Sequence, residues 1–457
     1  MKKNVYILSF SAFVVNLGFG AAMPLIPFLL LAFDGLLTDL PENLGTIENA
    51  SQIAFQMTVL VAAFMLTRAM FARHFGRLSD VVGRKRIVVI GLALYTVLAF
   101  AYTLVFSWIG LLVVRATQGV ASAMVWPVAE AMITDSVSSS ERGKYMGWYM
   151  TLSNISFFIG PSMGAYLYKI AAFNLYIPLP YSLLFPFYIL TILSLVGLIL
   201  SLFTVETISA DKRKNAKYGI FVEKTDKIKI KLPPRISRSL KVIYIMGFAN
   251  GIAMGLVAPV SQIFVIEFIT ADPSAIGLLS TVSGFAGFLV TYPAGIISDK
   301  IGRKKIIISG QLASRTATFF VPFVKDFNTL LTIYSGRVMA FNIMSPPYRA
   351  LQADLVPKEM RGDVFGTVQT LFNFGAAFAP LGGLLYQIAS EWSFNIFGYT
   401  VPGVAVSFWL SAFIGFFTTA LFILFVHEPK EEEKEYISAI DRDLLSKTPL
   451  TVSVEKS

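Results

Sequence analysis

The sequence of 457 residues contains no cysteine and only two histidines, His74 and His427. The missing thiols exclude disulfide bonds, thiolate metal ligands and a cysteine nucleophile. Both histidines lie at the edges of apolar runs, so we expect neither a histidine-based metal site nor a serine–histidine catalytic triad. Charged residues are also scarce, at 14% of the chain against about 25% in soluble domains. The sequence therefore predicts no metal, no cofactor and no enzymatic activity.

Apolar residues make up 55% of the chain and gather in long runs. A helix of about 20 apolar residues spans a bilayer, and such runs recur throughout the sequence. The first run follows Met-Lys-Lys and is too long for the apolar part of a signal peptide, so we interpret it as the first span. We predict an all-α membrane protein with twelve transmembrane helices, at residues 5–31, 51–73, 86–106, 108–133, 145–168, 182–204, 240–269, 274–297, 305–324, 328–354, 365–389 and 404–426.

The net charge of +10 arises from Lys and Arg that gather on one side of these spans. They crowd segments 73–86 and 212–241, which follow even-numbered spans, whereas loop 34–48 holds four acidic residues and no basic one. Because cytoplasmic loops carry the excess of Lys and Arg, both termini are expected in the cytoplasm and the protein in the cell membrane. This distribution explains the charge without a nucleic-acid partner.

One pattern occurs twice. Residues 76–85 read GRLSDVVGRK and residues 295–304 read GIISDKIGRK, at an offset of 295 − 76 = 219. The same offset relates Pro127 to Pro346 and Asn154 to Asn373, which indicates two copies of one unit. We therefore predict two pseudo-symmetric six-helix halves. Their expected boundaries are 1–204 for the first half, 205–239 for a cytoplasmic linker, 240–426 for the second half and 427–457 for a cytoplasmic tail.

This repeated loop resembles the motif between helices 2 and 3 of the Major Facilitator Superfamily. The matching residues are Gly76, Asp80, Gly83 and Arg84, with Gly295, Asp299, Gly302 and Arg303 in the second copy. The resemblance implies a gate, in which the loop of one half touches a helix start of the other half. We thus expect Asp80 near residues 363–365 and Asp299 near Lys144. A carboxylate there would be stabilised by the helix dipole. The alternative is that the loops only orient the protein by charge.

Charged residues near these loops occupy matching positions in the two halves. They are Glu130, Asp135 and Arg142 in the first half, and Arg349, Asp354 and Arg361 in the second. A network with Arg84 or Arg303 would break as the protein opens, whereas solvated helix ends are the alternative. A second motif, with Gly160, Pro161 and Gly164 and with Pro380 and Gly383 in the second half, resembles the antiporter motif of drug/proton exporters. Proline bends such a helix and the small residues allow close packing, so a packing kink is the alternative.

Polar residues within the spans suggest a path for substrate or protons. Arg115 and Gln118 resemble the helix 4 motif of the exporters, where the arginine is linked to proton movement. We assign the path to Asn16, Arg115, Gln118, Asn154, Arg337 and Asn373. No carboxylate lies at mid-depth in the expected cavity helices, which argues against proton coupling and makes a neutral or anionic substrate credible. Arg68 is interpreted as reaching the inner face and Glu267 as lying near the outside, and Arg315 receives no role.

The resemblance implies a secondary active transporter that moves a small organic solute by alternating access. Export of the multidrug type is the first choice, since two motifs resemble those of the twelve-span drug/proton antiporters. Uptake of an organic anion or nutrient is the second, and a non-transporting receptor or sensor on the same fold is the third. The expected partners are a small-molecule substrate, the lipid bilayer and a possible coupling proton, and the expected state is a monomer.

Overall fold

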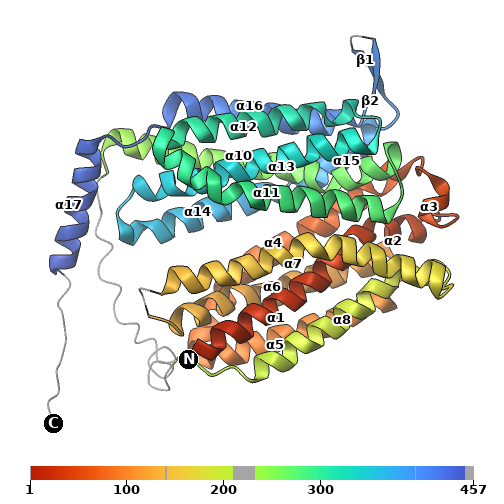
Figure 1. Cartoon of the computed structure of the whole chain (residues 1–457), viewed down its shortest axis with the longest axis horizontal. Coiled ribbons are helices and arrows are strands. Elements are labelled where there is room, and N and C mark those ends of the chain that lie inside the picture. Colours follow the sequence, from red (N-terminus) through yellow and green to blue (C-terminus); the bar gives the residue numbers. More distant parts are fainter. Residues whose placement is uncertain (1, 139–140, 209–231, 397, 448–457) are drawn as a thin grey trace.

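The computed structural model describes residues 2–138, 141–208, 232–396 and 398–447, and these are almost entirely helical. Figure 1 shows two bundles of long helices side by side, with the start of α1 and the helix α17 at one end. We call this the proximal end and the opposite one the distal end. The first bundle comprises α1 (Lys2–Ala22), η1 (Met23–Leu25), α2 (Ile26–Phe33), α3 (Pro41–Leu44), η2 (Ala50–Ile53), α4 (Ala54–Val82), α5 (Arg84–Ala101), η3 (Tyr102–Leu104), α6 (Trp108–Asp135), α7 (Arg142–Lys169), η4 (Ile170–Asn174) and α8 (Tyr181–Leu202).

The second bundle repeats this order. It comprises α10 (Pro234–Phe268), α11 (Pro273–Ile301), α12 (Arg303–Phe320), η5 (Val321–Phe323), α13 (Phe327–Asp354), α14 (Lys358–Ala376), α15 (Ala379–Ala389), β1 (Ser393–Ile396), β2 (Tyr399–Pro402), α16 (Ala405–Phe425) and α17 (Glu431–Lys447). Strands β1 and β2 form an antiparallel hairpin, with Ser393 opposite Pro402, at the distal end (Figure 1). The helix of the second half begins at Pro234, six residues before its predicted start, and residues 209–231 of the predicted linker lie outside the described residues.

Nine helical segments of the described residues are long and apolar enough to cross a membrane. The other three predicted spans coincide with α7, α12 and α13, which are long helices of lower hydropathy. Charged side chains inside them, such as Arg315 in α12, account for part of this difference. Each predicted span thus falls on a helix, and twelve crossings stays a prediction.

Small residues bring helices into close contact. A Cβ atom on Gly164 of α7 would lie 1.8 Å from the carbonyl oxygen of Ala21, and one on Gly160 would lie 2.8 Å from the Cα of Gly20. The predicted small-residue face of α7 therefore packs on α1. Pro161 lies inside a continuous α7, whereas the second half is interrupted between α14 and α15, just before Pro380. The two halves differ at the predicted kink.

The halves are joined at the distal end. The backbone N–H of Ile47 donates to the carbonyl of Ile266 at 3.0 Å, and that of Ala271 donates to Gly45 at 2.7 Å. The largest apolar core includes Phe28, Phe187 and Tyr386 and so draws on both halves, whereas a separate core packs the proximal part of the second half.

At the proximal end α7 and α14 have open faces. A Cβ atom added to Gly143, Gly147, Gly362 or Gly366 would meet nothing within 4 Å. Figure 1 shows the two bundles diverging toward this end. The structure is therefore closed at the distal end and open at the proximal end.

Candidate functional site

The two predicted gate loops have the same local geometry. Gly83 ends α4 and begins α5 with φ of 113°, and Gly302 does the same between α11 and α12 with φ of 97°. An L side chain is strained at such angles, so the second glycine of each motif is needed for the turn. Gly76 and Gly295, the first glycines, have no neighbour within 4 Å of an added Cβ.

The charges of each loop pair within their own half. Arg84 binds Asp80 at 3.5 Å and also binds Asp135, while Arg303 binds Asp299 at 3.4 Å and also binds Asp354. Among the described residues, no hydrogen bond or ion pair joins Asp80 to α14 or Asp299 to α7. The predicted contacts between halves are thus not made in this conformation, which is open at the end where they would form.

Arg142 and Arg361 make equivalent hydrogen bonds in the two halves. The Nε atom of Arg142 donates to the carbonyl of Thr134 at 3.3 Å, and that of Arg361 donates to Ala353 at 3.1 Å. Each arginine at the start of one helix thereby satisfies a carbonyl near the end of the preceding helix. Glu130 interacts electrostatically with Arg68, and its counterpart Arg349 is exposed.

Each half has a glutamate that caps a helix, a repeat that was not evident from the sequence. The carboxylate of Glu206 accepts the backbone N–H groups of Arg84 and Lys85, at 3.1 and 3.3 Å, at the start of α5. In the second half, Glu428 accepts the N–H of Lys304 at the start of α12. The two glutamates are 428 − 206 = 222 residues apart, so the repeat offset of 219 did not reveal them. Each carboxylate satisfies free donors and the positive end of a helix dipole.

Replacing Glu206 with alanine is expected to lower the stability of the purified protein by about 1 kcal/mol, the usual effect of losing a helix cap. The N–H groups of α5 would lose their acceptor. Thermal melting in detergent measures this, with Glu48→Ala as a control that removes an exposed acid. An equal melting temperature for the two variants would contradict a capping role.

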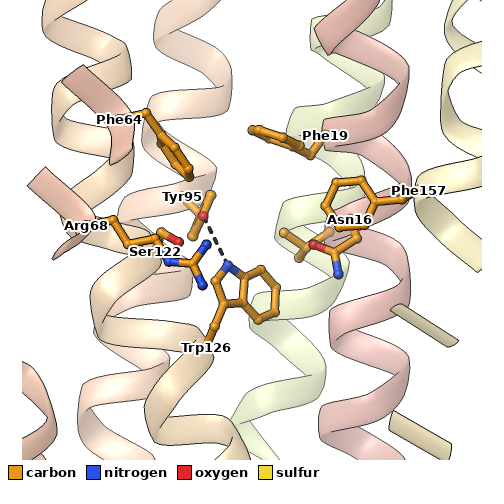
Figure 2. A pocket seen from close by; sticks show the side chains of 9 residues that line it. Asn16, Phe19, Phe64, Arg68, Tyr95, Ser122, Trp126 and Phe157 are labelled. Atoms are coloured by element: carbon orange, nitrogen blue, oxygen red, sulfur yellow. Dashed lines mark hydrogen bonds between the residues drawn. The ribbon is translucent and has the colours of Figure 1, made fainter. Parts of the chain in front are cut away.

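A pocket lies within the first half, at about the middle of its helices. It is an open hollow of about 370 Å³, with the adjoining solvent space included. Figure 2 shows the guanidinium group of Arg68 directed toward Trp126, with Asn16 and Phe157 on the facing wall. The lining residues are Val15, Asn16 and Phe19 of α1, Phe64 and Arg68 of α4, Tyr95 of α5, Ser122 and Trp126 of α6, and Phe157 of α7.

Aromatic contacts fix the pocket walls. Trp126 donates its indole N–H to the hydroxyl of Tyr95 at 3.3 Å. The ring of Phe19 packs edge-on to Phe157 with centroids 6.1 Å apart, and lies 6.2 Å from Phe64. The walls therefore present flat apolar faces with few polar groups, as small-molecule sites commonly do.

Arg115 lies behind this wall and not on it. Its side chain is 5% exposed, and its guanidinium lies 5.4 Å from the Phe19 ring and 5.0 Å from the Phe64 ring. It donates to the Oε1 atom of Gln118 at 3.0 Å, which also accepts the hydroxyl of Tyr102 at 2.8 Å. The predicted residues Arg115 and Gln118 are brought together, but they support the aromatic wall, whereas Asn16 reaches the pocket.

Other predicted path residues lie apart from this pocket. Asn154 of α7 is exposed, one and two turns before Phe158 and Ser162, which contact α11 of the other half. Asn373 of α14 accepts from Gln369 at 3.0 Å. Helical spacing thus places Asn154 on the seam between the halves, while its role stays a prediction.

Two arginines of the second half have local partners. The guanidinium of Arg337 lies 4.4 Å from the Tyr334 ring. Arg315 donates to the Oδ1 atom of Asn250 at 2.6 Å, which also accepts from Thr418 at 3.2 Å. Arg315 therefore links α12 to α10 and α16, and its placement indicates a packing role in the second half.

Two half-buried carboxylates lie at the distal end, and their burial was not evident from the sequence. Tyr168 donates to Glu42 at 3.0 Å, and Tyr386 donates to Glu267 at 3.1 Å, so each half holds a tyrosine–glutamate pair. Lys169 of the first half binds Asp272 of the second at 3.3 Å beside Glu42. Burial raises the pKa of Glu42 above its ordinary value. Among the described residues, no cluster of three or more possible ligands could hold a metal ion.

Comparison with known proteins covers nearly the whole chain. The model of the family described as the Major Facilitator Superfamily matches residues 8–238 and 243–453. Multidrug resistance protein 2 of Bacillus subtilis (strain 168) is 23% identical over 408 residues, which are 88% of this chain and 93% of that protein. The quinolone resistance protein NorA of Staphylococcus aureus (strain COL) is 22% identical over 410 residues, which are 89% of this chain and 96% of that protein.

Solved structures share the fold at lower sequence identity. The xylose transporter XylE from E. coli, in an inward-open conformation, matches with a TM-score of 0.62 and 15% identity, over 95% of this chain and 99% of that one. The likeness concerns the arrangement of the helices and says nothing of the solute.

Proposed function

Because the chain belongs to the Major Facilitator Superfamily and is a multi-pass membrane transporter of that family, we propose that it exports a small organic solute by alternating access. In this proposal both termini and the proximal end face the cytoplasm, and the structure represents the inward-open state. The observation that carries the proposal is the joining of the two halves at one end only. A site reached from one side at a time requires a seam that closes at either end in turn.

Export is favoured over uptake by the full-length relatives named for multidrug and quinolone resistance. The likeness to a xylose transporter keeps nutrient uptake as the second candidate, although it rests on the fold alone. A receptor that moves no solute is the third. The matched loops at Gly83 and Gly302 argue against it, because a fixed receptor needs no such pair.

We propose that transport is coupled to protons through Glu42 and Glu267. Each carboxyl group is half-buried against a tyrosine at the distal end, where opening would expose it further to the outside. A carboxylate is costly to bury, so proton uptake from the outside would accompany closure of the distal end. Inward proton movement would then require release of that proton through the open proximal end before the distal end opens again. This proposal revises the expectation from the sequence, which found no carboxylate suited to coupling.

Transport by purified protein in liposomes tests these proposals. Export predicts that a pH gradient drives a solute, from a panel of drug-like compounds, in the direction opposite to proton flow. Glu267→Gln is expected to reduce gradient-driven transport at least tenfold while leaving exchange of solute for solute in place. Uptake in the same direction as the protons would favour the second candidate, and movement of no solute would favour the receptor.

A further inference from the structure

The pocket of the first half contains a cation without a partner. Arg68 is exposed to the pocket, and it makes no hydrogen bond or ion pair with any residue that the structure describes. The helix α4 continues to Val82, and 82 − 68 = 14 residues of rise place Arg68 about 21 Å from the helix end. Arg68 thus lies well before the end of α4, with a side chain that is exposed at the open pocket.

The other arginines within the helices differ in this respect. Arg115 donates to Gln118 and is covered by two phenylalanine rings, and Arg315 donates to Asn250. Arg337 lies over the ring of Tyr334. Arg68 alone of these four lines the pocket. A guanidinium offers five donors in a planar fork, so its free donors can take a carboxylate in a bidentate manner.

The aromatic walls around Arg68 favour a flat ligand. Trp126 lies next to the guanidinium, and Phe19, Phe64 and Phe157 complete the apolar surface (Figure 2). Aromatic rings stack on such faces, which adds about 0.5–1.5 kcal/mol per pair beyond simple burial. Asn16 supplies an amide on the facing wall, and none of the lining residues is acidic.

One carboxylate acts on Arg68 from outside the pocket lining. Glu130 follows Trp126 by one turn of α6 and interacts electrostatically with Arg68, but no ion pair within 4.0 Å joins them in the described part of the chain. An anionic ligand at Arg68 would therefore meet one favourable guanidinium and one repelling carboxylate at a greater distance.

From these observations we infer that the pocket binds a flat aromatic anion, with its carboxylate on Arg68 and its ring against Trp126 and the phenylalanines. The inference rests on the proposed transport of a small organic solute and names the class of solute. It also makes Arg68 the residue that determines charge specificity, with Arg115 as a positioning residue behind the wall.

Binding to the purified protein tests this with three ligands that share one ring system: 2-naphthoate, its neutral amide and 2-naphthylmethylamine, which is a cation. Isothermal titration calorimetry at pH 7.5 measures each affinity. We expect naphthoate to bind at least tenfold more tightly than the amide, and the amine to bind most weakly. In Arg68→Gln the acid should lose this advantage, and in Arg68→Lys it should keep only part of it, because lysine retains the charge without the fork.

Two further variants separate a binding role from a structural one. Arg73→Gln removes an exposed arginine of the same helix and should leave all three affinities within twofold of the original protein. Glu130→Gln should tighten naphthoate binding severalfold, because it removes the repelling charge. Thermal melting verifies that each variant is folded.

Two outcomes would overturn the inference: naphthoate binding no more tightly than the amide, including no binding of either, or weaker naphthoate binding in Glu130→Gln. The binding measurements do not depend on transport. If the protein exports only cationic or neutral solutes, the proposed function stands and this inference fails. If it binds naphthoate as described but moves no solute, the inference stands and the proposed function fails.

Discussion

Replacing Gly164 with leucine is expected to leave little folded protein. In the native structure a Cβ atom at this position would lie 1.8 Å from the carbonyl oxygen of Ala21 and 2.5 Å from its carbonyl carbon. Backbone atoms cannot yield as a flexible side chain can, so α7 would have to move away from α1 along much of its length. Overpacking of this kind costs about 3 kcal/mol or more, a large share of the stability of a typical protein.

The matched control is Gly147→Leu in the same helix. A Cβ atom at Gly147 meets nothing within 4 Å, so the identical substitution adds the same side chain without a clash. Yield of monodisperse protein on size exclusion and the melting temperature in detergent measure both variants. We expect Gly147→Leu to resemble the original protein and Gly164→Leu to lose most of its monodisperse fraction. Comparable behaviour of the two variants would show that the contact between α1 and α7 is not as close as the structure indicates.

The repeat in the sequence predicted the parts of the fold that depend on local chemistry. Glycine at 83 and 302 is required by backbone angles within one turn of the chain. Such features follow from residue type and spacing alone. The same reasoning found the close-packing glycines of α7, because small residues four apart share one helix face.

Arg68 shows why the pocket could not be predicted in the same way. The apolar run ends near residue 73, which predicts that Arg68 lies close to the inner face. The helix continues through a polar stretch to Val82, so the pocket forms around a residue well before the helix end. Hydropathy marks where a helix becomes polar and not where it ends.

The partial burial of Glu42 and Glu267 could not be predicted for a different reason. Each lies near the end of a span, where an acid is ordinarily solvated. Their burial depends on Tyr168 and Tyr386, more than a hundred residues away in sequence, and on the contact between the two halves. Contacts of that kind leave no local pattern. Arg115 is the opposite case. Its motif is visible in the sequence, but the packing of Phe19 and Phe64 against its guanidinium group is not.

Reversing the charge of Lys169 is expected to open the distal end. Lys169→Asp would replace an ion pair across the two halves with two facing carboxylates, beside a third at Glu42. Like charges at this separation repel, and opening of the seam relieves the repulsion. Because the chain has no cysteine, Thr281→Cys provides a reporter without background. Thr281 is enclosed by Phe158 and Ser162 in the closed seam. Its rate of labelling by a membrane-impermeant maleimide should rise severalfold in Lys169→Asp.

A second substitution distinguishes repulsion from general damage. Asp272 also caps α11, since its carboxylate accepts the N–H of Ser274 at 2.7 Å. Asparagine can keep this cap while removing the charge, so Asp272→Asn in the Lys169→Asp background should return labelling most of the way to its original rate. Labelling that stays high in the double variant would indicate a loosened fold instead of an electrostatic gate.

The same cysteine reporter tests whether closure of the distal end becomes more or less favourable as the pH rises. Burial raises the pKa of Glu42 in the closed state, against Tyr168, Lys169 and Asp272, relative to an open state in which the carboxyl group is hydrated. A group whose pKa is raised by closure binds protons more tightly in the closed form, so its contribution to closure is present at low pH and is lost as the pH rises through its raised pKa. The thiolate fraction raises every maleimide rate with pH, so the comparison is made with Glu42→Gln at each pH. Relative to that variant, labelling of Thr281→Cys should increase with pH, because glutamine can occupy the site at any pH without a charge.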